Sequence, residues 1–127
     1  MIIGMGTDIV ELARLDAAMK RGGEEFLQRI YTAAELEEGK DRLEYLGGRW
    51  AAKEAAAKAL GCGIGSGCSF TDIEIIDAPT GAPALTCRAR AAKTLAEKHK
   101  LRWHVSISHE HAYAVATVIV EAEVSSL

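Results

Sequence analysis

Two carboxylates in apolar surroundings are the residues of this sequence best suited to chemistry. Asp8 lies in the N-terminal stretch "MIIGMGTDIV", on the same strand face as two glycines that leave space above it. Glu54 lies in the alanine-rich stretch "RWAAKEAAAKALG", on the helix face that also carries Trp50. A carboxylate in such surroundings needs a cation or several hydrogen-bond donors. Each also has a plain structural interpretation, because Asp8 could cap the next helix and Glu54 could pair with Lys58 one turn later.

Basic residues in and near the same helix point to an anionic ligand. Arg49 and Lys53 are four residues apart with like charge, which is unfavourable on a helix unless an anion lies nearby. Lys58 follows in the helix, and His109 ends a predicted strand. Two carboxylates without a cluster of cysteines or histidines suit Mg²⁺, which takes one or two carboxylates, several waters and phosphate oxygens. The residues alone therefore indicate magnesium-dependent phosphate chemistry and nothing finer.

Other kinds of site fit the sequence poorly. The glycine-rich loop "GCGIGSG" lacks the Gly-Lys-Ser/Thr of a P-loop and does not match the dinucleotide fingerprint. Cys62 and Cys68 are too far apart for the usual zinc pair, and no second pair exists. Ser108 and His109 are neighbours on a strand and point to opposite faces, which disfavours a hydrolase pair.

The patterns predict the elements that must position these residues. Some segments show the apolar spacing and capping signals of helices, and others show the apolar alternation of strands. Strands at both ends with helices between them predict an α+β fold, in which a small antiparallel sheet packs with a long central helix. Gly61 is expected to cap that helix, and Gly47-Gly48 within it suggest the close approach of another chain or a ligand. We expect strands at 1–10, 69–78, 84–88, 103–110 and 113–122, and helices at 11–21, 24–30, 33–39, 42–60 and 89–100.

Length and composition bound the answer further. The 127 residues predict a single domain over 1–127. The net charge of −3 disfavours non-specific binding of nucleic acid. We expect no membrane segment, because the longest apolar run is too short to span a bilayer as a helix. The odd number of cysteines, three, and an N-terminus without a basic signal region favour a reduced, cytoplasmic protein.

Three segments resemble one enzyme family in order and spacing: "GMGTDIVEL" at 4–12, "GRWAAKEAAAKALG" at 48–61 and "HVSISHEHAYAVA" at 104–116. "GIG" at 63–65 followed by "SFTDIEI" at 69–75 fits as well. On these residues the sequence resembles the holo-acyl-carrier-protein synthases, the short bacterial 4'-phosphopantetheinyl transferases. The resemblance spans almost the whole chain and implies their fold.

The resemblance implies an activity with its cofactor and partners. These enzymes move 4'-phosphopantetheine from coenzyme A to a serine of apo acyl carrier protein and release adenosine 3',5'-bisphosphate. They use Mg²⁺, serve fatty acid biosynthesis and related lipid metabolism, and are typically homotrimers with sites between subunits. The sequence does not say whether a fatty-acid or a polyketide carrier is preferred.

The resemblance also implies roles for individual residues. Asp8 and Glu54 would bind the metal, with Glu54 as the base, acting directly or through a water. Lys58 would act beside the coenzyme A phosphates, so that the predicted catalytic residues are Asp8, Glu54 and Lys58. The predicted coenzyme A contacts are Arg49, Lys53, Lys58, Gly65 in the covering loop 61–67, and His109, with Arg49 and His109 reaching from across an interface.

The first helix is the expected docking surface for an acidic carrier protein. Its basic residues are Arg14, Lys20 and Arg21, although Glu24 and Glu25 stand where family members are often basic. A solvated helix face is the plain alternative for these three residues. For the whole chain the alternatives are a non-catalytic module that binds coenzyme A or another nucleotide, a scaffold that binds carrier proteins, and a different magnesium-dependent phosphotransferase or hydrolase.

Overall fold

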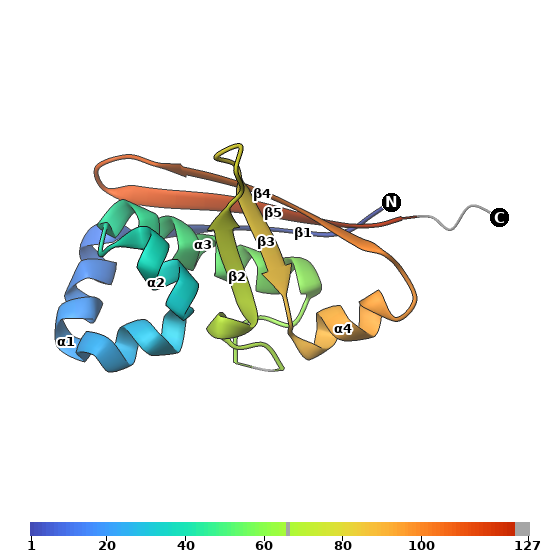
Figure 1. Cartoon of the computed structure of the whole chain (residues 1–127), viewed down its shortest axis with the longest axis horizontal. Helices are drawn as coiled ribbons and strands as arrows, with labels where there is room; N and C mark the ends of the chain where they lie inside the picture. The colour runs from blue at the N-terminus through green and yellow to red at the C-terminus, as the bar shows by residue number, and fades with distance from the viewer. Residues whose placement is uncertain (66, 124–127) are drawn as a thin grey trace.

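A strand and a helix lie against each other at the centre of the molecule (Figure 1). The computed structural model describes residues 1–65 and 67–123. Strand β1 (Ile2–Glu11) alternates between an exposed face and a face covered by helix α3 (Leu43–Leu60). A Cβ atom at Gly4 would lie 1.9 Å from the carbonyl oxygen of Ala59, and one at Gly6 would lie 2.0 Å from that of Ala55. The space above these glycines is therefore filled by α3.

The predicted C-terminal hairpin is confirmed. Strands β4 (Leu101–His109) and β5 (Tyr113–Ala122) pair antiparallel, and β5 also pairs with β1, so that the sheet order is β1-β5-β4. The buried face of β5 packs on α3, where alanines allow the helix to approach closely. The core of this layer includes Ala51, Ala52, Ala55, Ala56, Val118 and Val120.

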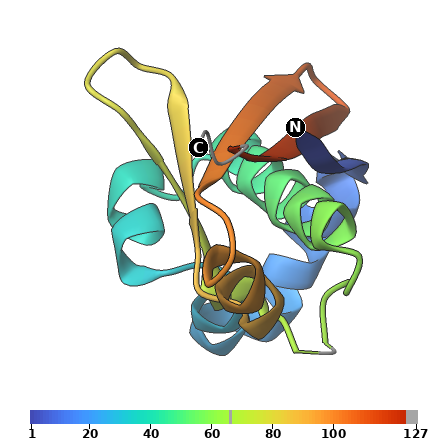
Figure 2. The ribbon, with the colours of Figure 1, turned by 90° about the vertical axis from the view of Figure 1, so that its right-hand side faces the viewer.

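A second, two-stranded sheet completes the predicted α+β fold. It pairs β2 (Ile73–Asp77) with β3 (Pro83–Cys87), and β2 contacts α3. The hairpin of β2 and β3 is not hydrogen-bonded into the three-stranded sheet, but β3 lies beside β4, as Figure 2 shows. The prediction of a strand over 69–78 is wrong in its first residues. Phe70–Asp72 form the 3₁₀ helix η1 instead, because Asp72 accepts hydrogen bonds from the backbone N–H and the hydroxyl of Ser69.

The helices end where the capping signals predict, with one exception. Helix α1 (Leu12–Ile30) is broken at Gly23, which has φ 59° and ψ −147°, as the two expected helices require. Helix α2 (Ala33–Gly39) begins with the predicted capping box, and α3 ends at Gly61 in the left-handed conformation with φ 79°. Helix α4 (Arg90–Ala96) is shorter than the expected 89–100, because the last four residues of that range are polar and exposed.

Packing within the chain explains Gly47 and Gly48. A Cβ atom at Gly47 would meet the side chain of Leu12 at 2.3 Å, and one at Gly48 would meet that of Ile107 at 2.7 Å. Within the single chain, the close approach at these glycines is made by side chains of α1 and β4. Within residues 1–65 and 67–123, no helix is both long enough and apolar enough to cross a membrane.

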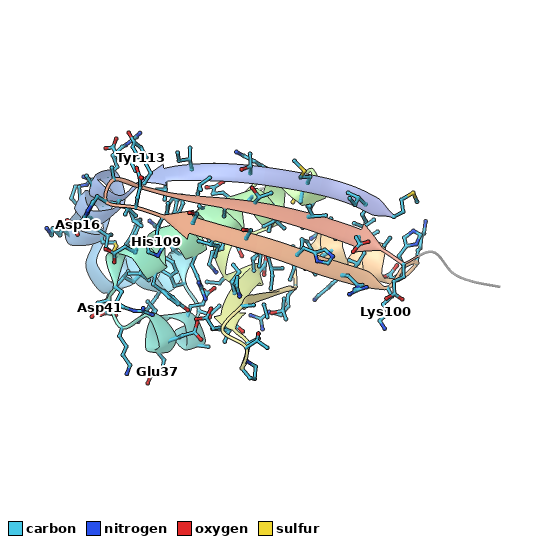
Figure 3. The ribbon with its side chains drawn as sticks, turned by 90° about the horizontal axis from the view of Figure 1, so that it is seen from above. Asp16, Glu37, Asp41, Lys100, His109 and Tyr113 are labelled. Atoms are coloured by element: carbon cyan, nitrogen blue, oxygen red, sulfur yellow. The ribbon has the colours of Figure 1, made fainter. Side chains whose placement is uncertain are left out.

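The face of the three-stranded sheet that points away from α3 is uncovered in the single chain (Figure 3). Large hydrophobic side chains are exposed along β1 and at the start of β5. Met5 and Ile9 are 64% and 62% exposed, which is unusual for residues of a regular strand. The other exposed hydrophobic residues on these strands are Ile2, Ile3, Tyr113 and Val115.

Candidate active site

Asp8 and Lys58 meet where β1 runs beside the last turns of α3. Pairing with Ala116 on β5 fixes the position of Asp8 in the sheet. Lys58 Nζ lies 3.1 Å from Asp8 Oδ1 and donates a hydrogen bond of 3.0 Å to the carbonyl oxygen of Thr7. The side chain of Lys58 is 52% exposed and that of Asp8 is 20% exposed. Asp8 therefore pairs with a lysine at the surface and does not cap α1, whose N-cap is Glu11.

Glu54 lies one turn before Lys58 on α3 and is half-buried. Burial raises the pKa of Glu54 above its ordinary value, the negative charge of Asp8 raises the pKa further, and the Lys58 ammonium opposes both effects. A like charge shifts a pKa in this way only from nearby. The structure therefore brings Asp8 and Glu54 together. In the described part of the chain Lys58 forms its ion pair with Asp8, so the helix pair between Glu54 and Lys58 is not formed.

The two carboxylates line one cavity, which has a volume of about 460 Å³ and is bounded by β1, α1 and α3. Trp50, one turn before Glu54, forms part of its wall. The indole ring packs against two phenyl rings, with centroids 4.8 Å from Phe70 and 6.1 Å from Phe26. The wall beside Glu54 is therefore backed by a cluster of aromatic rings. The other charged residues of the lining are Glu11, Arg14 and Arg21.

Arg49 and His109 line a second cavity, of about 310 Å³. Arg49 is buried, with Nη2 2.8 Å from Asp77 Oδ1 and 3.2 Å from Glu38 Oε2. Its guanidinium also lies 4.0 Å from the centre of the Tyr45 ring. His109 is exposed at the hairpin end of the sheet, where Figure 3 shows it. Within one chain, Arg49 and His109 therefore share a cavity with each other and not with the carboxylate pair.

Comparisons with known proteins show the family of the chain. The family model of the 4'-phosphopantetheinyl transferase superfamily matches residues 4–118. The chain belongs to this superfamily. Holo-[acyl-carrier-protein] synthases of Shewanella sp. (strain MR-7) and of Vibrio cholerae are each 46% identical to it over 124 residues, which are 95% of this chain and 98% of theirs.

Solved structures of such synthases share the fold. The synthase of Helicobacter pylori, solved in complex with coenzyme A, has a TM-score of 0.83 at 36% identity and covers 92% of this chain and 99% of its own. The synthase of Neisseria meningitidis has a TM-score of 0.83 at 40% identity and covers 95% and 99%. The predicted family and fold are thus confirmed.

Three residues predicted to bind coenzyme A or the carrier protein are not among those that line the carboxylate cavity. Lys53 is fully buried and pairs with Glu35, so its side chain is not open to a ligand. Lys20 pairs with Asp16 at 2.9 Å and does not line the cavity, whereas the other two basic residues predicted on α1 do. Gly65 has φ 107° in the loop after α3, and its N–H bonds to the carbonyl oxygen of Cys68.

The carboxylate pair fits a divalent cation. The charge of Asp8 raises the pKa of Glu54, so each carboxylate would be stabilised by a cation between them. Among residues 1–65 and 67–123, no third histidine, cysteine or acidic residue joins them in a metal-binding group. A metal held here would therefore complete its shell with water and substrate oxygens, as Mg²⁺ commonly does.

Two parts of the site could not be assigned from the sequence. Trp50 shares a helix face with Glu54, so the sequence could have placed it in the cavity wall. Its stacking on Phe70 could not be predicted, because Phe70 lies in η1, which was not predicted from the sequence. The carboxylates that hold Arg49 come from α2 and β2, and nothing in the sequence indicates that they meet.

Proposed function

We propose that this chain transfers 4'-phosphopantetheine from coenzyme A to a serine of an apo acyl carrier protein, releasing adenosine 3',5'-bisphosphate. The observation that carries the proposal is the convergence of Asp8, Glu54 and Lys58 on one side of α3, in a chain that matches the synthases over nearly its whole length. The serine oxygen forms a bond to the phosphorus that carries the pantetheine. The bond from that phosphorus to the bridging oxygen breaks, and the serine proton passes to Glu54.

The proposed roles follow from the environment of each side chain. Glu54 is the base because it lines the same cavity as Asp8 and its raised pKa makes it a stronger proton acceptor than an ordinary carboxylate. Lys58 is half-exposed and can move from Asp8 to the phosphates, where its ammonium favours departure of the bridging oxygen. Asp8 and Glu54 would hold Mg²⁺. When bound, the ion neutralises negative charge on the pyrophosphate.

The reaction is tested by mixing the protein with coenzyme A, Mg²⁺ and an apo carrier protein. Intact-mass measurement should show one phosphopantetheine added to the carrier. A carrier whose acceptor serine is replaced by alanine is the matched control and should gain nothing. An unmodified wild-type carrier at saturating coenzyme A would overturn the proposed function.

The proposed assembly is a homotrimer with active sites between subunits. The uncovered sheet face offers the apolar surface for such contacts, and Met5 and Val115 are exposed on it. Because Arg49 and His109 do not share the carboxylate cavity, we propose that a neighbouring subunit presents them to coenzyme A. Light scattering should give three times the mass of the chain. Met5→Glu should dissociate the assembly and abolish transfer, and a fully active monomer would contradict the trimer.

The proposed docking surface for the carrier protein is α1. Arg14 and Arg21 line the carboxylate cavity, so acidic residues beside the acceptor serine can reach them as the serine approaches Glu54. Arg14→Glu should raise the KM for the carrier and leave the KM for coenzyme A unchanged. We also propose that the enzyme is cytoplasmic, because all three cysteines of the chain are free thiols.

A further inference from the structure

Glu35 and Lys53 form an ion pair inside the protein, away from the cavity of the catalytic residues. Both side chains are 0% exposed, and Lys53 Nζ lies 2.7 Å from Glu35 Oε1. A buried ion pair carries a large desolvation penalty, and an apolar pair of similar size is often as stable. Burial accordingly lowers the pKa of Lys53, and the negative charge of Glu35 opposes this shift. Glu35 also accepts the N–H of Thr32 in the capping box of α2, which explains a carboxylate at this position, but the cap does not require a buried ammonium at Lys53.

The pair differs from an apolar contact in the direction of its hydrogen bonds. Lys53 Nζ donates to the backbone carbonyl oxygens of Phe70 and Ile73 as well as to Glu35. The second carboxylate oxygen of Glu35 accepts the N–H of Ile75 at 2.8 Å. These bonds connect α3 with α2, η1 and β2. Because hydrogen bonds are directional, they restrain how far α3 can slide along its axis or rotate about it.

Much of the remaining buried surface of α3 is made of small side chains. Side chains position a packed helix through ridges that enter the grooves of its neighbours. Methyl groups form low ridges, so the directional bonds of Lys53, together with those of Arg49 to α2 and β2, add a restraint that the alanines do not supply. The buried alanines are Ala51, Ala52, Ala55, Ala56, Ala57 and Ala59.

A shift of α3 would reach the catalytic carboxylates directly. The phenyl ring of Phe70, whose carbonyl accepts from Lys53, stacks on Trp50. Trp50 and Glu54 are one turn apart on α3, and both line the carboxylate cavity. Asp8 lies on β1, and its place depends on the pairing with β5. Moving α3 therefore changes the spacing between Glu54 and Asp8.

We propose that Glu35 and Lys53 are positioning residues of the transfer reaction, which set α3 so that Trp50 and Glu54 face Asp8. This inference rests on the proposed function and adds two residues that touch neither substrate. It predicts that the two charges are needed for turnover even where they are not needed for folding.

The test replaces the ion pair by an apolar pair, Glu35→Leu with Lys53→Met. The matched control is Leu85→Ala, which removes buried methyl groups from β3 without touching the pair. Thermal unfolding, kcat and both KM values are measured for each variant in the intact-mass assay. We expect kcat of the double variant to fall about tenfold or more, since small displacements of reacting groups slow catalysis strongly. The KM for coenzyme A should change little, and the control should keep its kcat despite an equal or larger loss of stability.

A double variant with the kcat of the control would overturn the proposal. Should the double variant not fold, Glu35→Gln keeps the size of the side chain and weakens the bond to Lys53. Its kcat should then fall as well, and an unchanged kcat overturns the proposal equally. Absence of transfer by the wild-type protein would instead overturn the proposed function, so the two failures are distinguishable.

Fluorescence of Trp50 provides a readout that loss of stability alone would not move. The chain has two tryptophans, so Trp103→Phe leaves Trp50 as the single emitter. In that background the double variant should shift the emission maximum and increase quenching by acrylamide at temperatures where it is fully folded. Leu85→Ala should do neither. An unchanged Trp50 spectrum in the double variant would show that the ion pair does not place α3.

Discussion

Two lysines on α3, Lys53 and Lys58, meet carboxylates in opposite environments. Lys53 and Glu35 are both 0% exposed, and every hydrogen bond that Lys53 makes goes to the protein interior. Lys58 is 52% exposed and its partner Asp8 is 20% exposed. The two contacts have similar lengths, 2.7 Å and 3.1 Å, so the two ion pairs differ in burial and not in distance.

The difference teaches which charge is available for chemistry. A buried ammonium with three fixed acceptors cannot turn to a new anion without leaving a carboxylate unpaired in the core. A half-exposed ammonium can exchange its partner at little energetic cost, because water compensates both states. This difference supports the proposals that Lys53 holds α3 in place and that Lys58 exchanges Asp8 for a phosphate.

Replacing Lys53 should destabilise the protein much more than replacing Lys58. Lys53→Ala leaves the Glu35 carboxylate buried without a cation, and should lower the free energy of unfolding by about 3–5 kcal/mol. Lys58→Ala breaks a contact with an exposed partner, and should lower it by about 1 kcal/mol or less. Urea unfolding of both variants measures the two losses. Equal losses would show that burial does not distinguish the pairs.

Substitutions in the carboxylate cavity should reduce activity strongly and stability only slightly, the opposite of the effect expected from Lys53→Ala. Asp8→Ala and Glu54→Ala should each reduce kcat by about 100-fold or more, because a metal ligand or the proton acceptor is lost. Neither change should lower stability much, since both side chains face the cavity. Glu97→Ala, an exposed carboxylate after α4, is the control. Full turnover by either cavity variant, with the dependence on Mg²⁺ unchanged, would defeat the roles proposed for these carboxylates.

The two lysines also show how far the sequence could be interpreted. Alternation in β1, the capping box of α2 and Gly61 after α3 are local signals, so the sequence predicted these elements and the inward direction of Glu54. The partner of Lys53 is not local, because Glu35 lies on another helix and reaches α3 only through tertiary packing. Like charge at Arg49 and Lys53 predicted that something anionic lies nearby. Carboxylates of the chain itself pair with each residue, and the sequence pattern does not indicate which ones.

Lys58→Ala should slow turnover more than it weakens substrate binding. If the ammonium acts on the departing bridging oxygen, its interaction is stronger in the transition state than in the ground state. We expect kcat to fall by about 100-fold, as for loss of one charge-stabilising donor, with a smaller rise in the KM for coenzyme A. Initial rates over a range of coenzyme A concentrations measure both. A large rise in KM with kcat unchanged would make Lys58 a binding residue only.

A third pair at the surface should show the smallest effect. His104 Nε2 lies 2.5 Å from Glu121 Oε1, and these side chains are 48% and 33% exposed. The hydrogen bond from His104 lowers the pKa of Glu121 in the folded protein. The stability this adds is present above the ordinary pKa of the carboxyl and is lost as pH falls through the lowered one, because the unfolded chain takes up its proton first.

Glu121→Gln should therefore lower the melting temperature slightly at neutral pH, and the difference from wild type should vanish in acid. Glu123→Gln is the matched control on the same segment, and it should show no such dependence on pH. Melting temperatures from neutral pH down to below the ordinary value of 4.5 provide the measurement. A difference that persists in acid would mean that Glu121 stabilises the sheet through packing and not through its charge. The decrease in stabilisation from the buried ion pair to the exposed ones would then not include the pair of His104 and Glu121.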